Sequence, residues 1–108
     1  MTEDAARAEY DAVVALLEAT HGARAGRMFG MPCIQASRKM VAGYWRGAMV
    51  FKLPPSVHAE ALALEGAERF DPGMGRPMKE WVVVPVAHAA RWPALAEAAW
   101  GYVAGGAG

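Results

Sequence analysis

The stretch at residues 73–85, GMGRPMKEWVVVP, has the composition of a loop that could hold an anion, because two glycines, two basic side chains and a tryptophan precede a run of valines. A phosphate-binding P-loop needs GxxxxGK followed by Ser or Thr between a strand and a helix, and a dinucleotide-binding loop needs GxGxxG at the start of a helix. Here the glycines precede a strand, which favours a turn between two strands. Arg76 and Lys79 remain candidate ligands for an anion at the edge of this loop. Trp81 is either a cap on the core or the floor of a pocket.

The other reactive side chains lack the spacing that catalysis or metal binding needs. Cys33 is the only cysteine, so no internal disulfide can form, and no histidine is close in sequence to activate it, which predicts an inert buried thiol. His21, His58 and His88 stand singly, without the i,i+3 or i,i+4 pairs that build a metal site from one element. A GxSxG motif and a close carboxylate pair on a predicted strand end or loop are also absent from the sequence. We therefore expect no metal, no cofactor and no enzymatic activity.

Composition and net charge exclude several classes of protein. The chain has 108 residues, 55% of them hydrophobic and 20% charged, and 11 basic and 11 acidic side chains give a net charge of zero. These values are typical of one globular domain rather than a disordered tail. They also give little electrostatic affinity for nucleic acid, and no predicted helix carries clustered Arg or Lys, so we expect no specific nucleic-acid binding. No apolar run reaches the length of a membrane span, so the expected location is cytoplasmic, with no membrane attachment.

The charges are unevenly distributed along the chain. The segment from His21 to Lys52 contains six Arg or Lys residues and no Asp or Glu, whereas residues 3–18 contain five acidic side chains and one arginine. If the two segments pack side by side, their fields largely cancel. The alternative is that the acid-free segment forms a patch for an anionic ligand or partner.

Hydrophobic periodicity predicts an α+β domain. Apolar residues at helical spacing predict a helix over residues 3–21, a short helix over 56–65 and a last helix over 92–103. Short runs rich in Val, Met and aromatic residues predict five strands, which lie at 27–36 (interrupted by a glycine and a proline), 39–45, 48–53, 67–70 and 78–85. Because the connections are too short for parallel crossovers, we expect a two-layer α/β sandwich, α-β(3)-α-β(2)-α, with an antiparallel five-stranded sheet.

Several of these segments resemble a known family. RMFG at Arg27–Gly30, FKL at Phe51–Leu53 and the strand that begins at Trp81 are similar, in pattern and order over about residues 10–104, to the N-terminal domain family of the competence regulator TfoX/Sxy. The YjbR/MmcQ-like domains, which carry a basic-Trp strand start comparable to MKEW, are the second family that the chain resembles. Either resemblance implies the topology given above and implies neither catalytic residues nor a cofactor.

The resemblance also sets the expected domain organisation and function. Residues 1–104 are predicted to form a single TfoX N-terminal-like domain, and residues 105–108 a frayed Gly/Ala tail. Members of the TfoX family carry a further C-terminal helical domain beyond the part that this chain resembles, so the resemblance by itself does not imply competence regulation. The expected function is a non-catalytic interaction or regulatory module. The alternative is a small-molecule or anion-binding domain of the YjbR/MmcQ-like type, whose candidate ligand-binding residues are Arg27, Arg76, Lys79 and Trp81.

The hairpin around the Arg46-Gly47 turn is the candidate interface. A two-stranded hairpin cannot bury both faces unless helices cover one and something else covers the other. An apolar outer face with a basic rim would suit a homodimer contact or an acidic protein partner. The residues assigned to this interface are Met40, Tyr44, Trp45, Arg46 and Met49. The alternative is that the fold turns the apolar members of this hairpin inward.

Overall fold

The first helix, α1, spans Glu3–His21 in the computed structural model, which describes residues 2–28, 30–71 and 79–107. Thr2 caps its start, because the Thr2 hydroxyl oxygen accepts a hydrogen bond of 3.1 Å from the backbone N–H of Ala5. Gly22, with a φ of 70°, ends the helix in the left-handed conformation that glycine adopts without strain. The buried stripe of α1 consists of Ala6, Tyr10, Val13 and Leu17. The helix predicted over residues 3–21 is confirmed.

The sheet has six strands within the described residues, in the order β1-β2-β3-β4-β6-β5. Every neighbouring pair is antiparallel, as predicted. The strands are β1 (Arg24–Met28), β2 (Met31–Ala36), β3 (Lys39–Trp45), β4 (Ala48–Lys52), β5 (Glu68–Arg69) and β6 (Trp81–Pro85).

The prediction of five strands is wrong, because the chain reverses within the stretch RMFGMPCIQA. Gly30 has a φ of 75°, in the left-handed region, and it belongs to a tight turn that pairs Met28 with Met31. Residues 27–36 therefore contribute to two strands of a hairpin. A glycine followed closely by a proline is equally typical of an interrupted strand and of a turn, so periodicity alone does not separate the two readings.

Two further tight turns connect β2 to β3 and β3 to β4. The predicted Arg46-Gly47 hairpin turn is confirmed, with φ values of 50° and 82°. The β2–β3 turn has no glycine, and Ser37 takes a φ of 56° in it. This left-handed backbone conformation costs a residue with a side chain about 1–2 kcal/mol.

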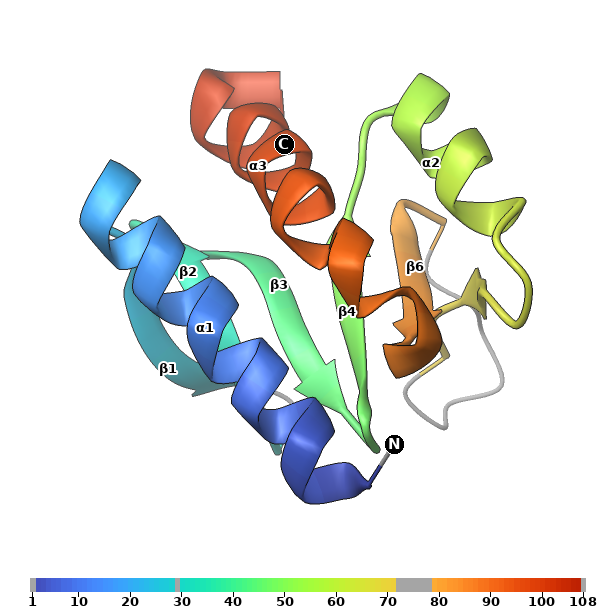
Figure 1. The fold of residues 1–108 in the computed structure, drawn as a ribbon. Helices are drawn as coiled ribbons and strands as arrows, with labels where there is room; N and C mark the ends of the chain where they lie inside the picture. Colours follow the sequence, from blue (N-terminus) through green and yellow to red (C-terminus); the bar gives the residue numbers. More distant parts are fainter. Residues whose placement is uncertain (1, 29, 72–78, 108) are drawn as a thin grey trace.

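The helices cover one face of the sheet (Figure 1). Besides α1, these are α2 (Pro55–Leu62) and α3 (Trp92–Tyr102), which correspond to the two predicted later helices with slightly different ends. A 3-10 helix, η1 (Val86–Arg91), leads into α3, and a π-helical turn (Val103–Ala107) continues it. This layer and the sheet enclose the main core, whose largest fully buried side chains are Trp92, Phe51, Leu17, Ile34, Met49 and Leu53.

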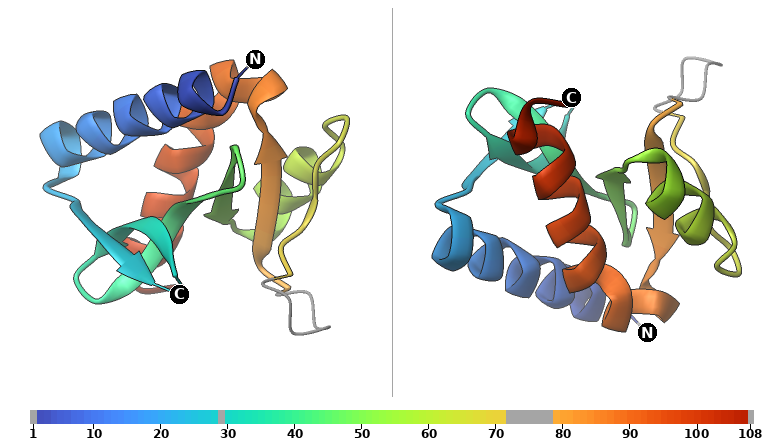
Figure 2. Two further views of the ribbon diagram at one scale, coloured as in Figure 1. Left: turned by 90° about the horizontal axis from the view of Figure 1, so that it is seen from below. Right: turned by 90° about the horizontal axis from the view of Figure 1, so that it is seen from above.

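The opposite face of the sheet carries a second apolar cluster, here called the outer cluster. Its buried members are Met31, Cys33, Met40, Val50, Phe70 and Trp81. The ring of Trp45 at the end of β3 meets that of Phe70, just beyond β5, edge to face at 5.3 Å between centroids. Because β4 and β6 lie between these two strands, the sheet must bend round the outer cluster, and Figure 2 shows its strong twist.

Candidate functional site

The residues predicted to hold an anion do not come together in the described part of the chain. Trp81 is only 7% exposed and belongs to the outer cluster, whereas Lys79 lines a hollow beside α2. Arg27 lies on β1, which β2, β3 and β4 separate from β6 in the sheet, and its Nη2 donates to the Gly30 carbonyl of its own hairpin over 3.0 Å. Arg76 lies outside the described residues. The described members of this set therefore form no common pocket.

The predicted interface residues are divided between the two faces of the sheet. Tyr44 and Met49 lie in the main core, and the Tyr44 hydroxyl donates to the Glu3 carbonyl over 3.2 Å. Met40 and Trp45 pack in the outer cluster. Arg46 is exposed, with its guanidinium 4.9 Å from the centroid of the Trp45 ring.

The outer face of the hairpin is covered by residues from a distant part of the sequence. Phe70 and Trp81 lie over it, and the Phe70 N–H donates to the Trp81 carbonyl over 3.1 Å. Among the described residues, the only large apolar side chain that is exposed is Leu16 on α1, at 38%. The hairpin therefore offers a partner no open apolar face in the described structure.

The acid-free segment also contains the edge strand β1. Within the described residues β1 pairs only with β2, and Arg24, Ala25 and Arg27 are exposed. Such a strand presents unpaired backbone groups that another chain can use.

The pairing register shows which backbone groups of β1 point outward. Arg27 lies opposite Pro32, which has no N–H, so this pair cannot exchange two hydrogen bonds. The hydrogen-bonded pair is then the neighbouring one, Gly26 with Cys33. Since alternate residues face opposite sides of a strand, the N–H and C=O groups of Ala25 and Arg27 point away from β2.

The β1 edge is also positively charged. Arg24 lies opposite Gln35, and Ala36 pairs with Lys39, so the turn that contains Arg38 lies at the same end of the sheet as Arg24. The ion pairs within the described residues are Arg7–Asp11, His21–Glu97 and Lys52–Glu80. Arg24, Arg27 and Arg38 thus have no carboxylate partner in that part of the chain, and no ion pair there joins the acidic helix α1 to them. We call Arg24, Ala25, Arg27 and Arg38 the basic edge.

The cysteine packs among apolar side chains, and the described residues gather no set of metal-ligating side chains. Cys33 is fully buried in the outer cluster, and burial raises the pKa of its thiol, which disfavours the nucleophilic thiolate. No group of three or more His, Cys, Asp and Glu side chains within the described ranges could hold a metal ion.

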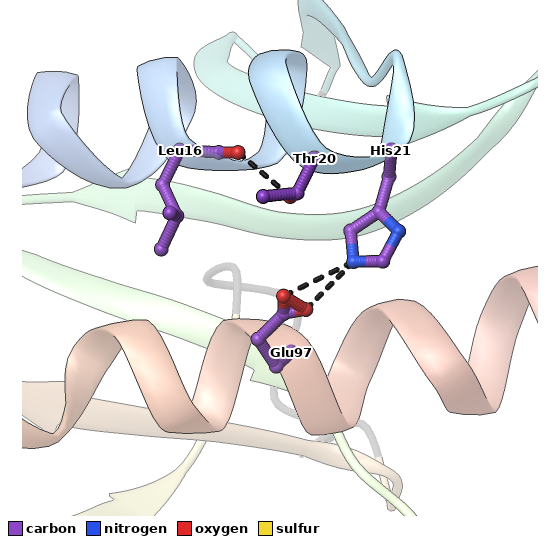
Figure 3. A network of polar contacts seen from close by, with 4 residues as sticks. All are labelled: Leu16, Thr20, His21 and Glu97. Atoms are coloured by element: carbon purple, nitrogen blue, oxygen red, sulfur yellow. Dashed lines mark hydrogen bonds and ion pairs between the residues drawn. The ribbon is translucent and has the colours of Figure 1, made fainter.

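A histidine–carboxylate pair joins α1 to α3 (Figure 3). His21 Nε2 lies 2.7 Å from Glu97 Oε2, and the imidazole stacks on Trp100 with 5.0 Å between ring centroids. Ser37 and His21 both line one hollow, but no hydrogen bond links the two side chains in the described structure. Next to His21, the Thr20 hydroxyl donates to the Leu16 carbonyl one turn earlier over 2.7 Å. The His21–Glu97 pair links the end of α1 to the middle of α3, and no nucleophile is hydrogen-bonded to the histidine among the described residues.

Comparison with known proteins gave no match to a family model, to a curated protein or to a solved structure. The resemblance to the TfoX/Sxy N-terminal domains therefore stays a prediction. No helix in the described ranges is both long and apolar enough to cross a membrane.

Proposed function

We propose that this protein is a non-catalytic interaction module, of the regulatory kind that the TfoX/Sxy resemblance implies, which binds an acidic, extended segment of a partner protein along β1. The observation that carries the proposal is the basic edge itself. It combines outward backbone groups on Ala25 and Arg27 with arginines that have no carboxylate partner in the described structure.

The outward backbone groups and the arginines would contribute to binding in different ways. An extended peptide that adds a strand to the sheet gains backbone hydrogen bonds, each worth about 1 kcal/mol net, while side-chain contacts set its specificity. Arg24 and Arg27 are three residues apart on β1, so their guanidinium groups lie on opposite faces of the sheet, and carboxylates on alternate residues of such a peptide would pair with one of them. Charged residues on an edge also prevent uncontrolled strand pairing, so the same arginines reject neutral or basic strands.

Charge argues against a second copy of this chain as the occupant of the edge. Two β1 strands that paired with each other would bring two sets of arginines together with no acidic side chain among them. Like charges on paired strands are destabilising. A second copy of the chain is therefore a less favourable occupant of the edge than an acidic segment. The experiment below would detect such self-association.

We expect a short peptide that alternates glutamate with valine to bind the protein, with an affinity that falls as salt is added because the arginine contacts are screened. Reversing two charges, Arg24→Glu with Arg27→Glu, should weaken binding about tenfold or more. The measurement is fluorescence anisotropy of the labelled peptide at low and at about 1 M salt, where the Debye length is about 3 Å. The matched control is Arg91→Glu, which reverses the charge of an exposed side chain on η1. It should leave the affinity for the peptide unchanged.

Three results would contradict the proposal. They are an unchanged affinity in the folded double variant, equal binding of a peptide that alternates lysine with valine, and a dimer in sedimentation that the double variant abolishes. The last of these would assign the edge to a second copy.

A further inference from the structure

A groove lies between α2 and α3 on the helical side of the molecule (Figure 1). The two helices run in opposite directions, because Pro55 at the start of α2 lines one hollow with Tyr102 at the end of α3. The groove, here called the α2–α3 groove, has a volume of about 260 Å³. The residues that form its two walls are Val57, Glu60 and Leu64 on the α2 side and Arg91, Ala94 and Ala98 on the α3 side.

Each wall of the α2–α3 groove is one stripe of a helix. Within each wall the three residues are spaced as i, i+3 and i+7, which places them on one face. Leu64 lies just after α2 and continues its last turn, since the Leu64 N–H donates to the Ala61 carbonyl over 3.1 Å. Arg91 lies just before α3, at the end of η1. Stripes at this spacing are the surfaces by which helices pack against other helices, so the groove presents two such surfaces side by side.

The two walls carry opposite charges. Glu60 on the α2 wall and Arg91 on the α3 wall are the charged residues that line the groove, and both are exposed. Neither belongs to an ion pair within the described ranges. A two-fold axis along the groove places each wall over the opposite wall of a second copy, so that Glu60 of one copy faces Arg91 of the other. The symmetry forms this pair twice.

The two walls also differ in the size of their apolar side chains. Val57 and Leu64 are on the α2 wall, whereas Ala94 and Ala98 are on the α3 wall. The same two-fold axis lays the two large side chains of one copy on the two alanines of the other, which favours close packing. The charges and the sizes therefore call for the same occupant. Long-range repulsion does not oppose it, because the net charge of the chain is zero.

We propose that the α2–α3 groove is the contact between two copies of this chain in a symmetric, reversible dimer. The dimer is of the transient kind, because the groove is short and its wall residues Val57, Leu64 and Ala98 are already half-buried in one chain. This inference goes beyond the proposed function and shares no residue with the basic edge. In the sheet, β2, β3 and β4 also lie between β1 and β6, on which α2 packs.

The test is sedimentation velocity of the full chain at concentrations from about 10 µM to about 1 mM, over which the unmodified chain should change from monomer to dimer. Reversing one charge, with Glu60→Arg or with Arg91→Glu, should weaken the dimer about tenfold or more, because like charges then meet twice. Combining the two changes in one chain restores opposite charges across the contact. The combined variant should therefore dimerise about as strongly as the unmodified chain.

Two further variants test the packing and separate this contact from the basic edge. Ala94→Gln should also weaken the dimer about tenfold, because its longer polar side chain takes the place of Leu64 of the second copy. Arg24→Glu with Arg27→Glu is the matched control on β1 and should leave the dimer unchanged. Arg91→Glu, conversely, should weaken the dimer and leave the affinity for the acidic peptide unchanged. Circular dichroism checks that each variant is folded.

Three results would overturn the inference. A chain that stays monomeric up to about 1 mM would leave the groove to a different protein. A dimer that the folded single charge reversals leave unchanged would place the contact elsewhere on the molecule. A combined variant that dimerises as weakly as the single reversals would rule out the two-fold arrangement of Glu60 against Arg91.

Discussion

Replacing Trp92 with alanine should remove about 3–5 kcal/mol from the free energy of unfolding, the usual cost of deleting a fully buried tryptophan. Trp92 is 0% exposed and starts α3, which packs against α1, β3 and β4, so the cavity would open in the middle of the main core. For a domain of this size the melting temperature should fall by at least about 12 °C. Urea titration followed by circular dichroism, with a thermal melt, measures both quantities.

Trp92→Phe separates loss of volume from loss of the indole N–H. Trp92 Nε1 is buried without a hydrogen-bond partner in the described structure, so removing it leaves no acceptor unpaired there. We expect the phenylalanine variant to lose less than half as much stability as the alanine variant. A loss for Trp92→Ala below about 1 kcal/mol would contradict the position of α3 against the sheet.

Gly43→Ala should destabilise the protein by about 1–3 kcal/mol, although Gly-to-Ala changes in regular structure usually stabilise. An added Cβ would lie 2.8 Å from the Met40 methyl carbon and 3.0 Å from the Pro32 carbonyl oxygen, and it would also collide with the Met31 methyl group. The methionine ends can move, whereas the backbone oxygen is fixed by the sheet. The same urea titration gives the change in free energy.

Shortening Met31 tests whether this crowding is the cause. With Met31→Val, the collision with the Met31 methyl group disappears, so the double variant should be more stable than the sum of the two single changes by about 0.5 kcal/mol or more. A stabilising or neutral Gly43→Ala change would mean that the outer cluster is packed more loosely than the structure shows.

Local sequence signals predicted most of the fold. The 3.6-residue spacing, the acidic first turn and Gly22 located α1, and the Arg46-Gly47 pair located the β3–β4 turn. The extra strand was missed because the turn at Gly30 lies inside a continuous apolar run, and the chain's reversal there depends on a backbone angle rather than on side-chain pattern. Gly30 two residues before Pro32 was compatible with a hairpin, but the same pair also fits an interrupted strand.

Site residues were harder to predict because their neighbours come from distant segments. The cover of the hairpin by Phe70 and Trp81 depends on the bend of the sheet, which no local pattern encodes. His58, Lys79 and Tyr102, for example, line one hollow although they come from α2, from the segment before β6 and from the end of α3. The absence of acid between His21 and Lys52, by contrast, was visible in the sequence, and the proposed basic edge lies within this segment.

The most direct test of the proposed function removes one outward backbone donor from the edge strand. Gly26→Pro first checks the register: it deletes a donor that bonds to β2, so it should cost stability, whereas Ala25→Pro deletes a donor that faces outward and should leave the fold intact. The deciding measurement is then the affinity of the folded Ala25→Pro variant for the peptide that alternates glutamate with valine. Strand addition along β1 predicts a loss of about tenfold or more, because the proline removes one intermolecular hydrogen bond and its ring blocks close approach of the added strand. An affinity equal to that of the unmodified chain would contradict the account.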